Sequence, residues 1–369
     1  MMITNQSASK KRIAMKTESV FLYRAHKEDW SYCHHASLCF FQDRFYAMWS
    51  NGHVNEDDCG QRVLICSSAD AQSWTKPEPL FDSSMGKYNP EVLTAAGFHV
   101  FRGQLTAYAG CYEYAPENIH NGHYIKINTA HQNTRLLAKT TADGVRWSEP
   151  VNLHLPVVPN HGPQPLHNGR LLIAGGIAFP YSDVPDGLSG WHMGGIYPAD
   201  WTDIFDDSEA IQLCQTRMNR DVFLCEGSFY QTDDDIIHMF LRSDKNVLWA
   251  ADSRDNGATW GRPYATEFSN CNTKFHAGRL PDGRFYLVGN PDPKGNRCPL
   301  VISTSPDGKN FDREYILADR RTEQRISGLH KTGIYGYPHS LVLGGRFYVI
   351  CSVHKEDILL LSCALSELI

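Results

Sequence analysis

Four short segments of the sequence repeat one pattern, in which a Ser or Thr is followed two residues later by Asp and then by an aromatic residue. The pattern suits a tight turn: the Asp side chain accepts hydrogen bonds from backbone N–H groups, Gly or Asn adopts positive φ, and the aromatic ring packs on the adjoining strands. Four matches, each after an apolar stretch, indicate a repeat architecture. We therefore expect their aspartates to be structural rather than catalytic. The segments are residues 68–74, 141–147, 253–260 and 305–311.

Short stretches rich in β-branched and aromatic residues occur along the whole chain, separated by Gly, Asp, Asn and Pro. This pattern predicts many strands joined by tight turns. No stretch predicts a helix of three turns, although residues 198–214 suit a shorter one. The sequence therefore predicts an all-β fold.

The repeated turn belongs to a larger unit that begins with a polar-to-apolar strand and continues through a hairpin. Six such units predict a six-bladed β-propeller, with seven blades as the alternative because residues 177–220 do not follow the pattern. The sixth unit lacks one strand, and residues 19–25 would supply it and close the ring. The units begin near His34, Asn89, His161, Glu226, Lys274 and Tyr337.

Size and charge narrow the class of protein. The 369 residues can bury a sizeable core, and we expect a disordered extension over residues 1–17 followed by a single domain over residues 18–369. The net charge of −6 gives no reason to expect a nucleic-acid or membrane partner. The eleven cysteines form no CxxC pair and the N-terminus has no secretory apolar core, so we expect a reducing, cytoplasmic setting. The sequence leaves the oligomeric state open.

Polar residues begin the six predicted innermost strands. In a propeller these strands line the central channel, so their first residues would form one polar pocket. Histidine recurs at equivalent positions, and such residues are either hydrogen-bonded parts of the framework or ligand-binding groups. Because the spacing matches no known zinc motif, the sequence predicts neither a metal site nor a cofactor. The recurring histidines are His34, His35, His161, His276 and His339.

Over about residues 30 to 365, the chain resembles the bacterial sialidases and related propellers with the same turn, known there as the Asp box. Cys225-Glu226, an apolar strand and Arg242 resemble the sialidase run that carries a Glu and a carboxylate-binding Arg. Gly289-Asn290-Pro291 followed by Arg297 is similar to the segment with another such Arg. Tyr337 begins a strand like the one that bears the nucleophile, and Asp57 lies in an acidic loop like that of the general acid.

The resemblance implies a glycoside hydrolase for an acidic sugar. Tyr337 would attack the anomeric carbon with help from Glu226, and Asp57 would protonate the leaving oxygen in a retaining reaction. The arginine forks would bind the substrate carboxylate. The predicted substrate-binding residues are Arg242, Arg297, His34, His35, Arg62, Asn89, His161, Lys274, His276 and His339.

One difference from the sialidases leaves the substrate open. Their first innermost strand carries an Arg-Ile-Pro triplet, where this chain has His34-His35-Ala36. The first carboxylate-binding arginine is therefore absent or replaced by His34, unless Arg62 or Arg24 compensates for it. One alternative is a polysaccharide lyase or rhamnosidase-like enzyme that acts on uronate glycans, with His34, His35 or His339 as the base. Another is a propeller that binds glycans without turnover. All three readings share a carbohydrate partner.

Overall fold

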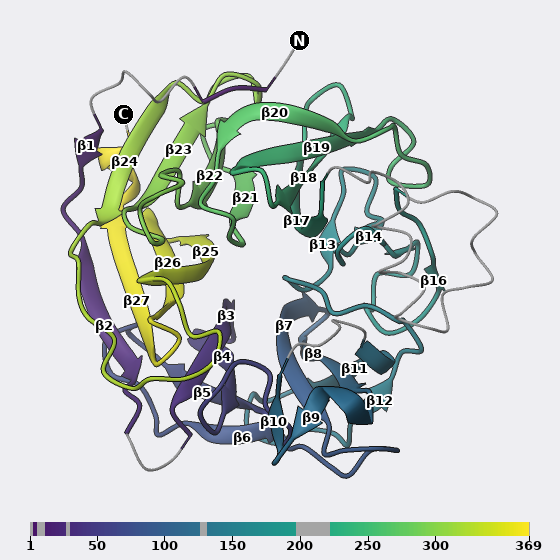
Figure 1. The fold of residues 1–369 in the computed structure, drawn as a ribbon. Helices are drawn as coiled ribbons and strands as arrows, with labels where there is room; N and C mark the ends of the chain where they lie inside the picture. The colour runs from purple at the N-terminus through teal and green to yellow at the C-terminus, as the bar shows by residue number, and fades with distance from the viewer. Residues whose placement is uncertain (1–2, 6–11, 27–29, 126–130, 197–221, 369) are drawn as a thin grey trace.

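Sheets of short strands stand around a common centre, and one edge strand of each sheet lies nearest that centre (Figure 1). The computed structural model describes residues 3–5, 12–26, 30–125, 131–196 and 222–368. These residues form six sheets of four or five strands and one two-stranded ribbon. The arrangement is the all-β propeller that the sequence predicts.

The first three sheets follow one another along the chain, and within each sheet neighbouring strands pair antiparallel. A ribbon of β9 (Ile119–His120) and β10 (His123–Tyr124) interrupts the second sheet. The sheets contain, in order, β3 (Tyr32–Phe41), β4 (Arg44–Gly52), β5 (Arg62–Ser68) and β6 (Glu78–Phe81); β7 (Val92–Phe101), β8 (Gln104–Tyr114), β11 (His131–Thr141) and β12 (Val151–Asn152); and β13 (Gln164–Pro165), β14 (Leu171–Leu172), β15 (Tyr181–Ser182) and β16 (Trp191–His192).

The last three sheets repeat the same order, and the N-terminal part of the chain adds a strand to two of them. Two short 3-10 turns, Pro116–Asn118 and Leu365–Glu367, complete the described structure. The sheets contain β17 (Leu224–Gln231), β18 (Ile237–Ser243), β19 (Val247–Ser253) and β20 (Tyr264–Ser269); β21 (His276–Arg279), β22 (Phe285–Gly289), β23 (Leu300–Ser305), β24 (Arg313–Ala318) and β1 (Ile13–Ala14); and β25 (Tyr335–Leu343), β26 (Arg346–Val353), β27 (Asp357–Ala364) and β2 (Glu18–Tyr23).

The ring is closed by strands from the two ends of the chain. Strand β2 pairs antiparallel with β27, as expected for the sixth unit, and so covers what would be an exposed edge. Strand β1 pairs in parallel with β24, and Ile3 is buried in the core between the fourth and fifth sheets. Residues 3–5 and 12–17 therefore differ from the disordered extension expected for residues 1–17, because backbone pairing and an apolar side chain hold them to the ring.

Hydrophobic cores lie between the sheets. Each sheet shares one cluster of buried apolar residues with the next sheet, and the last shares one with the first. Burial of these faces is the main stabilising contribution to such a ring. The seven-blade alternative and the short helix fall largely on residues 197–220, which lie outside the described residues.

The four repeated turns have the predicted chemistry. In the turn between β23 and β24, Asp307 Oδ1 accepts hydrogen bonds from the backbone N–H groups of Lys309 and Asn310, both at 2.8 Å. Asp70, Asp143 and Asp255 accept equivalent bonds in their own turns. The turn aromatics pack on the cores between sheets.

Two further observations concern the described residues. None of their helices is both long and apolar enough to cross a membrane. Each described cysteine is a free thiol, and several lie in the cores, where a thiol behaves as a small apolar group.

Candidate functional site

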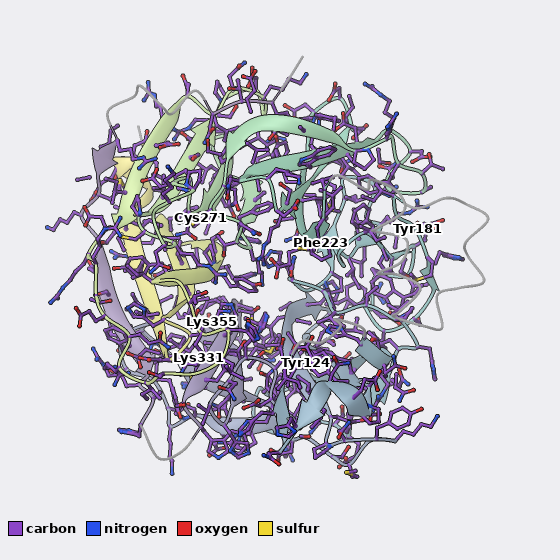
Figure 2. All side chains as sticks on the ribbon, viewed as in Figure 1. Tyr124, Tyr181, Phe223, Cys271, Lys331 and Lys355 are labelled. Carbon is purple, nitrogen blue, oxygen red and sulfur yellow. The ribbon has the colours of Figure 1, made fainter. Side chains whose placement is uncertain are left out.

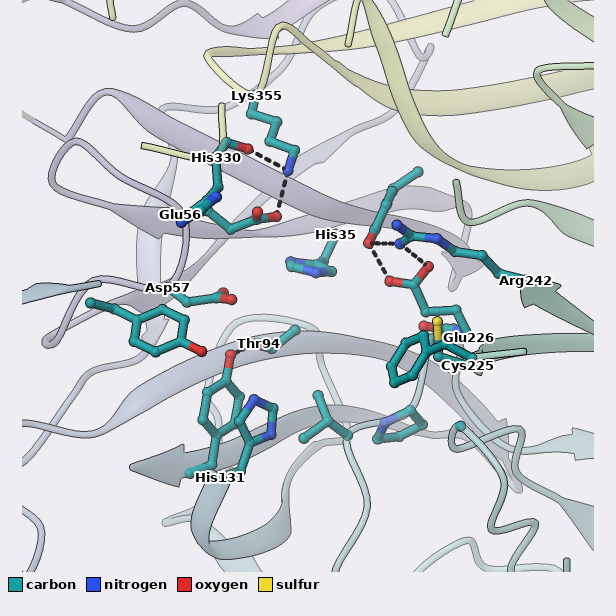
Figure 3. A pocket seen from close by; sticks show the side chains of 18 of the residues that line it. His35, Glu56, Asp57, Thr94, His131, Cys225, Glu226, Arg242, His330 and Lys355 are labelled. Carbon is teal, nitrogen blue, oxygen red and sulfur yellow. Dashed lines mark hydrogen bonds and ion pairs between the residues drawn. The ribbon is translucent and has the colours of Figure 1, made fainter. Parts of the chain in front are cut away.

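A pocket of about 730 Å³ lies at the centre of the ring, within the usual size of ligand sites. Its lining comes from strands of four of the six sheets and from several connecting loops. Figure 2 places Phe223, Tyr124 and Lys355 around the centre, whereas Tyr181 lies farther out. The close-up in Figure 3 shows His35 between an acidic pair, Glu56 and Asp57, and a second group that contains Glu226 and Arg242.

Three inner strands deliver their functional side chains by the same local device. The pairing register shifts between Gly336 and His339 in β25, between Cys225 and Gly227 in β17, and between His34 and Ser37 in β3. Each shift marks a β-bulge, which bends a strand and redirects a side chain. The bulged residues with positive φ that line the pocket are Tyr337 (φ 55°), Glu226 (φ 47°) and His35 (φ 53°).

Positive φ is costly for residues other than glycine, by about 1–3 kcal/mol each. It persists only where the surrounding structure enforces it, and such strain is concentrated at functional sites. The three equivalent bulges therefore make this pocket a candidate functional site. They are also the reason that strand periodicity alone does not give the direction of these side chains.

Tyr337, Glu226 and Arg242 form one hydrogen-bonded group. The Tyr337 hydroxyl donates to Glu226 Oε1. Arg242 Nη1 donates to Glu226 Oε2 at 2.7 Å and to the Tyr337 hydroxyl oxygen at 2.9 Å. Asn272 Oδ1 holds the other side of the guanidinium, at 2.7 Å from Arg242 Nε. The group therefore presents a phenol, its proton acceptor and a cation at one place.

Electrostatics set the protonation states of this group. Burial and the Glu226 carboxylate raise the pKa of Tyr337 well above its ordinary value, so the resting phenol keeps its proton. Burial also raises the pKa of Glu226, but Arg242 together with the Tyr337 hydroxyl and His35 more than offsets it, and the net pKa lies below the ordinary value. The pair therefore rests as a neutral phenol beside an ionised carboxylate, which is the state that a base-assisted nucleophile requires.

A second group faces the first across the pocket. Lys355 Nζ contacts Glu56 Oε1 at 2.5 Å and donates to the carbonyl oxygen of His330 at 2.9 Å. Burial lowers the pKa of Lys355 to about 8. Next to this pair, Asp57 Oδ2 accepts a hydrogen bond from the Tyr114 hydroxyl at 3.3 Å. The Tyr114 hydroxyl thus holds the Asp57 carboxylate on the side of the pocket that faces the group of Tyr337 and Glu226.

Arg297 is the cation of the pocket that lacks an acidic partner among the described residues. The side chain is buried, and its Nη1 has no hydrogen-bond partner within the described part of the chain. Its guanidinium carbon lies 5.4 Å from the centre of the Tyr337 ring. A buried cation without a partner is costly, so this atom is suited to an anion from outside the chain.

The structure brings six of the predicted site residues to this pocket: Tyr337, Glu226, Asp57, Arg242, Arg297 and His35. Burial and the charge of Lys274 lower the pKa of His35 to about 3, so its imidazole is neutral.

Three other predicted site residues lie elsewhere. His34 packs under Tyr337, with ring centres 3.8 Å apart, and bonds to Ser352. Arg62 stacks on the Trp30 ring, and Asn89 lines a different, smaller hollow. A role for these three in substrate binding stays a prediction.

The remaining four predicted residues lie outside the lining of the pocket. Lys274 is fully buried, and its Nζ donates to the carbonyl oxygen of Asn160 at 2.6 Å. Burial lowers the pKa of Lys274 to about 7. His161, His276 and His339 gather beside one another, with one ring nitrogen from each within 4.8 Å of the others.

Sequence reasoning missed the Glu56–Lys355 pair and an aromatic wall. Glu56 precedes the predicted acid in the loop NEDDCG, but Lys355 lies in a hairpin turn where a charged residue carries no signal. In the wall, the Tyr112 and His131 rings stack with centres 3.9 Å apart. Tyr114 and Tyr124 stack beside them at 3.6 Å. The pairing of β8 with β11, together with the ribbon that carries Tyr124, brings this wall together, rather than any local motif.

Comparison with solved structures shows the same fold in sialidases. A protein described as a sialidase has a TM-score of 0.66 and 17% identity, over 98% of this chain and 35% of its own. Trypanosoma rangeli sialidase in complex with sialic acid has a TM-score of 0.63 and 13% identity, over 97% of this chain and 60% of its own. The intramolecular trans-sialidase from Ruminococcus gnavus, in complex with oseltamivir carboxylate, has a TM-score of 0.64 and 12% identity, over 94% of this chain and 97% of its own.

These low identities establish the fold alone. This chain spans about a third of the length of the first protein and about three-fifths of the length of the second. A search among curated proteins finds no match. The family described as BNR repeat-like domain matches residues 43–349, which include all four repeated turns and most of the pocket. The chain therefore belongs to the BNR repeat-like domain family.

Proposed function

We propose that this protein is a retaining exo-glycoside hydrolase that removes an acidic sugar from a glycan or oligosaccharide. The observation that carries the proposal is the hydrogen-bonded group of Tyr337, Glu226 and Arg242 at the pocket. A phenol is a weak nucleophile until a base takes its proton, and Glu226 is the acceptor already in contact with it.

The two steps of the reaction use the two sides of the pocket. In the first, Tyr337 Oη bonds to the anomeric carbon, its proton passes to Glu226, and the glycosidic C–O bond breaks as Asp57 protonates the leaving oxygen. In the second, ionised Asp57 takes a proton from water, whose oxygen bonds to the same carbon. The Tyr337 C–O bond breaks as this new bond forms, and Glu226 returns its proton to the phenol oxygen.

The charges of the pocket favour an anionic sugar. The acids Glu226 and Glu56 are each paired with a cation, Arg242 and Lys355 respectively. Arg297 remains available to a ligand carboxylate, to which a guanidinium can donate two hydrogen bonds. A neutral phenol also approaches a carboxylate-bearing anomeric centre with less repulsion than a carboxylate nucleophile would. The Trypanosoma rangeli protein of the same fold is in complex with sialic acid.

The decisive test is covalent labelling. The full chain is incubated with fluorinated acidic-sugar inactivators, which trap the glycosyl–enzyme intermediate, and its peptides are analysed by mass spectrometry. We expect the adduct on Tyr337. The variant Tyr337→Phe should form no adduct and lose roughly 10³-fold or more in kcat, whereas Tyr181→Phe, away from the pocket, should behave as wild type. An adduct on another residue, or turnover by Tyr337→Phe, would overturn the mechanism.

A second candidate is a lyase that acts on uronate glycans, and the position of His35 favours it. His35 lines the pocket with a neutral ring, as a base for abstraction of a proton beside a carboxylate must. Of the histidines predicted for this role, His34 and His339 do not line the pocket. An unsaturated product that absorbs in the ultraviolet, formed by wild type and Tyr337→Phe but not by His35→Ala, would support the lyase.

A further inference from the structure

The N-terminal segment is fastened to the outer edge of the fifth sheet. Strand β1 extends that sheet by pairing in parallel with β24. The backbone N–H of Thr4 donates to the carbonyl oxygen of Lys309 at 2.9 Å, and that of Met15 donates to the carbonyl oxygen of Ile316 at 3.1 Å. Backbone hydrogen bonds before and after Arg12 therefore fix where its side chain leaves the segment.

Arg12 joins this segment to the loop between β22 and β23. Its Nη1 and Nη2 donate to the two carboxylate oxygens of Asp292, at 3.0 and 2.6 Å, and its Nε donates to Glu314 Oε2 at 2.7 Å. Glu314 belongs to β24 and is buried. A paired bond of this kind fixes the orientation of a carboxylate as well as its distance. Asp292 is thus tied to the outer strand of the sheet.

The same loop carries Arg297, and two turns connect Asp292 to it. The Gly295 N–H donates to the carbonyl oxygen of Asp292 at 2.9 Å, and the Cys298 N–H donates to that of Gly295 at 3.1 Å. Asn296 and Arg297 both have positive φ, at 53° and 59°. Such a backbone is costly for residues other than glycine and persists only where its surroundings enforce it. The anchor at Asp292 is one of the contacts that enforce it.

The Arg297 side chain lies in a slot that leaves little room for movement. A Cβ atom added at Gly333 would lie 2.3 Å from Arg297 Cδ, and one added at Gly336 would lie 3.1 Å from Arg297 Nη1. Behind the side chain, Asn290 Nδ2 donates to the carbonyl oxygen of Arg297 at 2.8 Å. Because the slot is this narrow, the guanidinium can point into the pocket only while the loop backbone keeps its place.

The geometry points to Arg12 as a positioning residue that, by holding Asp292, keeps the Arg297 guanidinium where it meets the carboxylate of a ligand. The inference rests on the proposed function for the ligand, an acidic sugar, whereas the contact between Arg12 and the loop is independent of turnover. A displaced guanidinium loses hydrogen bonds that depend on direction, and the loss falls on the charged ligand alone. A purely structural Arg12 would contribute to stability without any effect on the choice of ligand.

The first measurement is hydrogen exchange, followed by mass spectrometry on the full chain. Arg12→Met and Asp292→Ala each remove the same contact, so amides within residues 290–298 should exchange about tenfold faster in both variants. Asp292→Ala leaves Arg12 with Glu314 and makes the same test if Arg12→Met does not fold. Arg170→Met is the matched control, because it breaks a similar paired contact with Asp183 in the third sheet. Exchange in this loop that equals wild type in both loop variants would overturn the inference.

The second measurement is calorimetric binding of sialic acid and glucuronic acid, each compared with its methyl ester, which keeps the sugar and removes the charge. Arg12→Met should weaken binding of the preferred acid about tenfold and leave the ester unchanged. Arg12→Met combined with Arg297→Met should bind as Arg297→Met alone, because both changes act through one guanidinium. Arg170→Met should bind as wild type.

The outcomes separate this inference from the proposed function. A lower melting temperature for Arg12→Met with an unchanged ratio of acid to ester affinity would overturn the inference and leave the proposed function intact. Fully additive losses in the double variant would also overturn it. If wild type prefers neither acid to its ester, the proposed function fails and this role of Arg12 fails with it, while the exchange data still report whether Arg12 holds the loop.

Discussion

The Tyr337 hydroxyl donates a hydrogen bond to the Glu226 carboxylate across the channel, although 111 positions separate the two residues in the chain. Both residues stand at bulges of inner strands, so the bond joins two sheets rather than two flexible loops. Arg242 contacts both partners. The phenol and its base are thus held together before any ligand binds, which reduces the reorganisation that the first chemical step requires.

Arg242→Met should move the acid limb of the pH–rate profile. Arg242 now lowers the pKa of Glu226 against the effect of burial, so its removal should raise that pKa. Glu226 would then be protonated, and unable to accept the phenol proton, up to a higher pH. We expect the acid limb of kcat/KM to shift upward by about one pH unit or more, measured on an acidic-sugar glycoside. Arg279→Met, which changes an exposed ion pair with Asp233, should leave the limb in place.

Arg297→Met should stabilise the protein while it weakens ligand binding. Arg297 is a buried cation without an acidic partner among the described residues, so an apolar replacement should raise the melting temperature and add about 1 kcal/mol to the free energy of unfolding. Loss of its hydrogen bonds to the ligand should weaken binding of an acidic sugar about 100-fold and leave a neutral analogue unaffected. A variant less stable than wild type would show that Arg297 has a structural role.

Lys355→Met should be strongly destabilising, and a second change should reverse most of the loss. The single variant leaves Glu56 without its buried partner, at a cost of about 3–5 kcal/mol in the free energy of unfolding. Lys355→Met combined with Glu56→Gln removes both charges and should recover most of that energy in urea denaturation. The exposed pair Lys245–Asp244 is the control, and Lys245→Met should cost less than about 1 kcal/mol. Equal losses in the free energy of unfolding for Lys355→Met and Lys245→Met would contradict the prediction.

Asp307→Asn should lower stability at neutral pH but not in strong acid. Burial raises the pKa of Asp307, but the backbone N–H groups of Asn310 and Lys309 outweigh it and lower the pKa to about 2. Because the pKa is depressed in the folded protein, the stabilisation by the Asp307 carboxylate is complete above its pKa in the unfolded chain, about 3.9. This stabilisation is lost as the pH falls through about 2. Because the side chain is largely exposed, we expect about 1 kcal/mol or less, or about 1–2 °C in the melting temperature.

The measurement for this turn is thermal unfolding of both proteins at neutral pH and near pH 2. The difference between wild type and Asp307→Asn should disappear at the lower pH. A difference that persists there would mean that the amide fails to replace the carboxylate sterically, and that charge is not the cause. The other three turn aspartates provide independent repeats of the experiment.

Local chemistry made the architecture predictable. The capping role of Asp307 and its three counterparts depends only on residues within a few positions, and so does the alternation of apolar strands with Gly, Asp and Asn. The strand over residues 19–25 could be assigned because the sixth unit lacked one. Equivalent starts of the repeated units also indicated that Glu226 and Tyr337 approach the same axis, and the structure places both at one pocket.

Only the tertiary structure decided which polar groups meet and which way they face. The bulges at Glu226 and Tyr337 depend on pairing with the next strand, and the contact of Lys355 with Glu56 joins positions 299 apart. His34 and His35 are neighbours in sequence, yet one is buried under Tyr337 and the other lines the pocket. A turn is fixed by interactions within a few residues, whereas a pocket on a propeller axis is assembled from sheets that meet only when the ring closes.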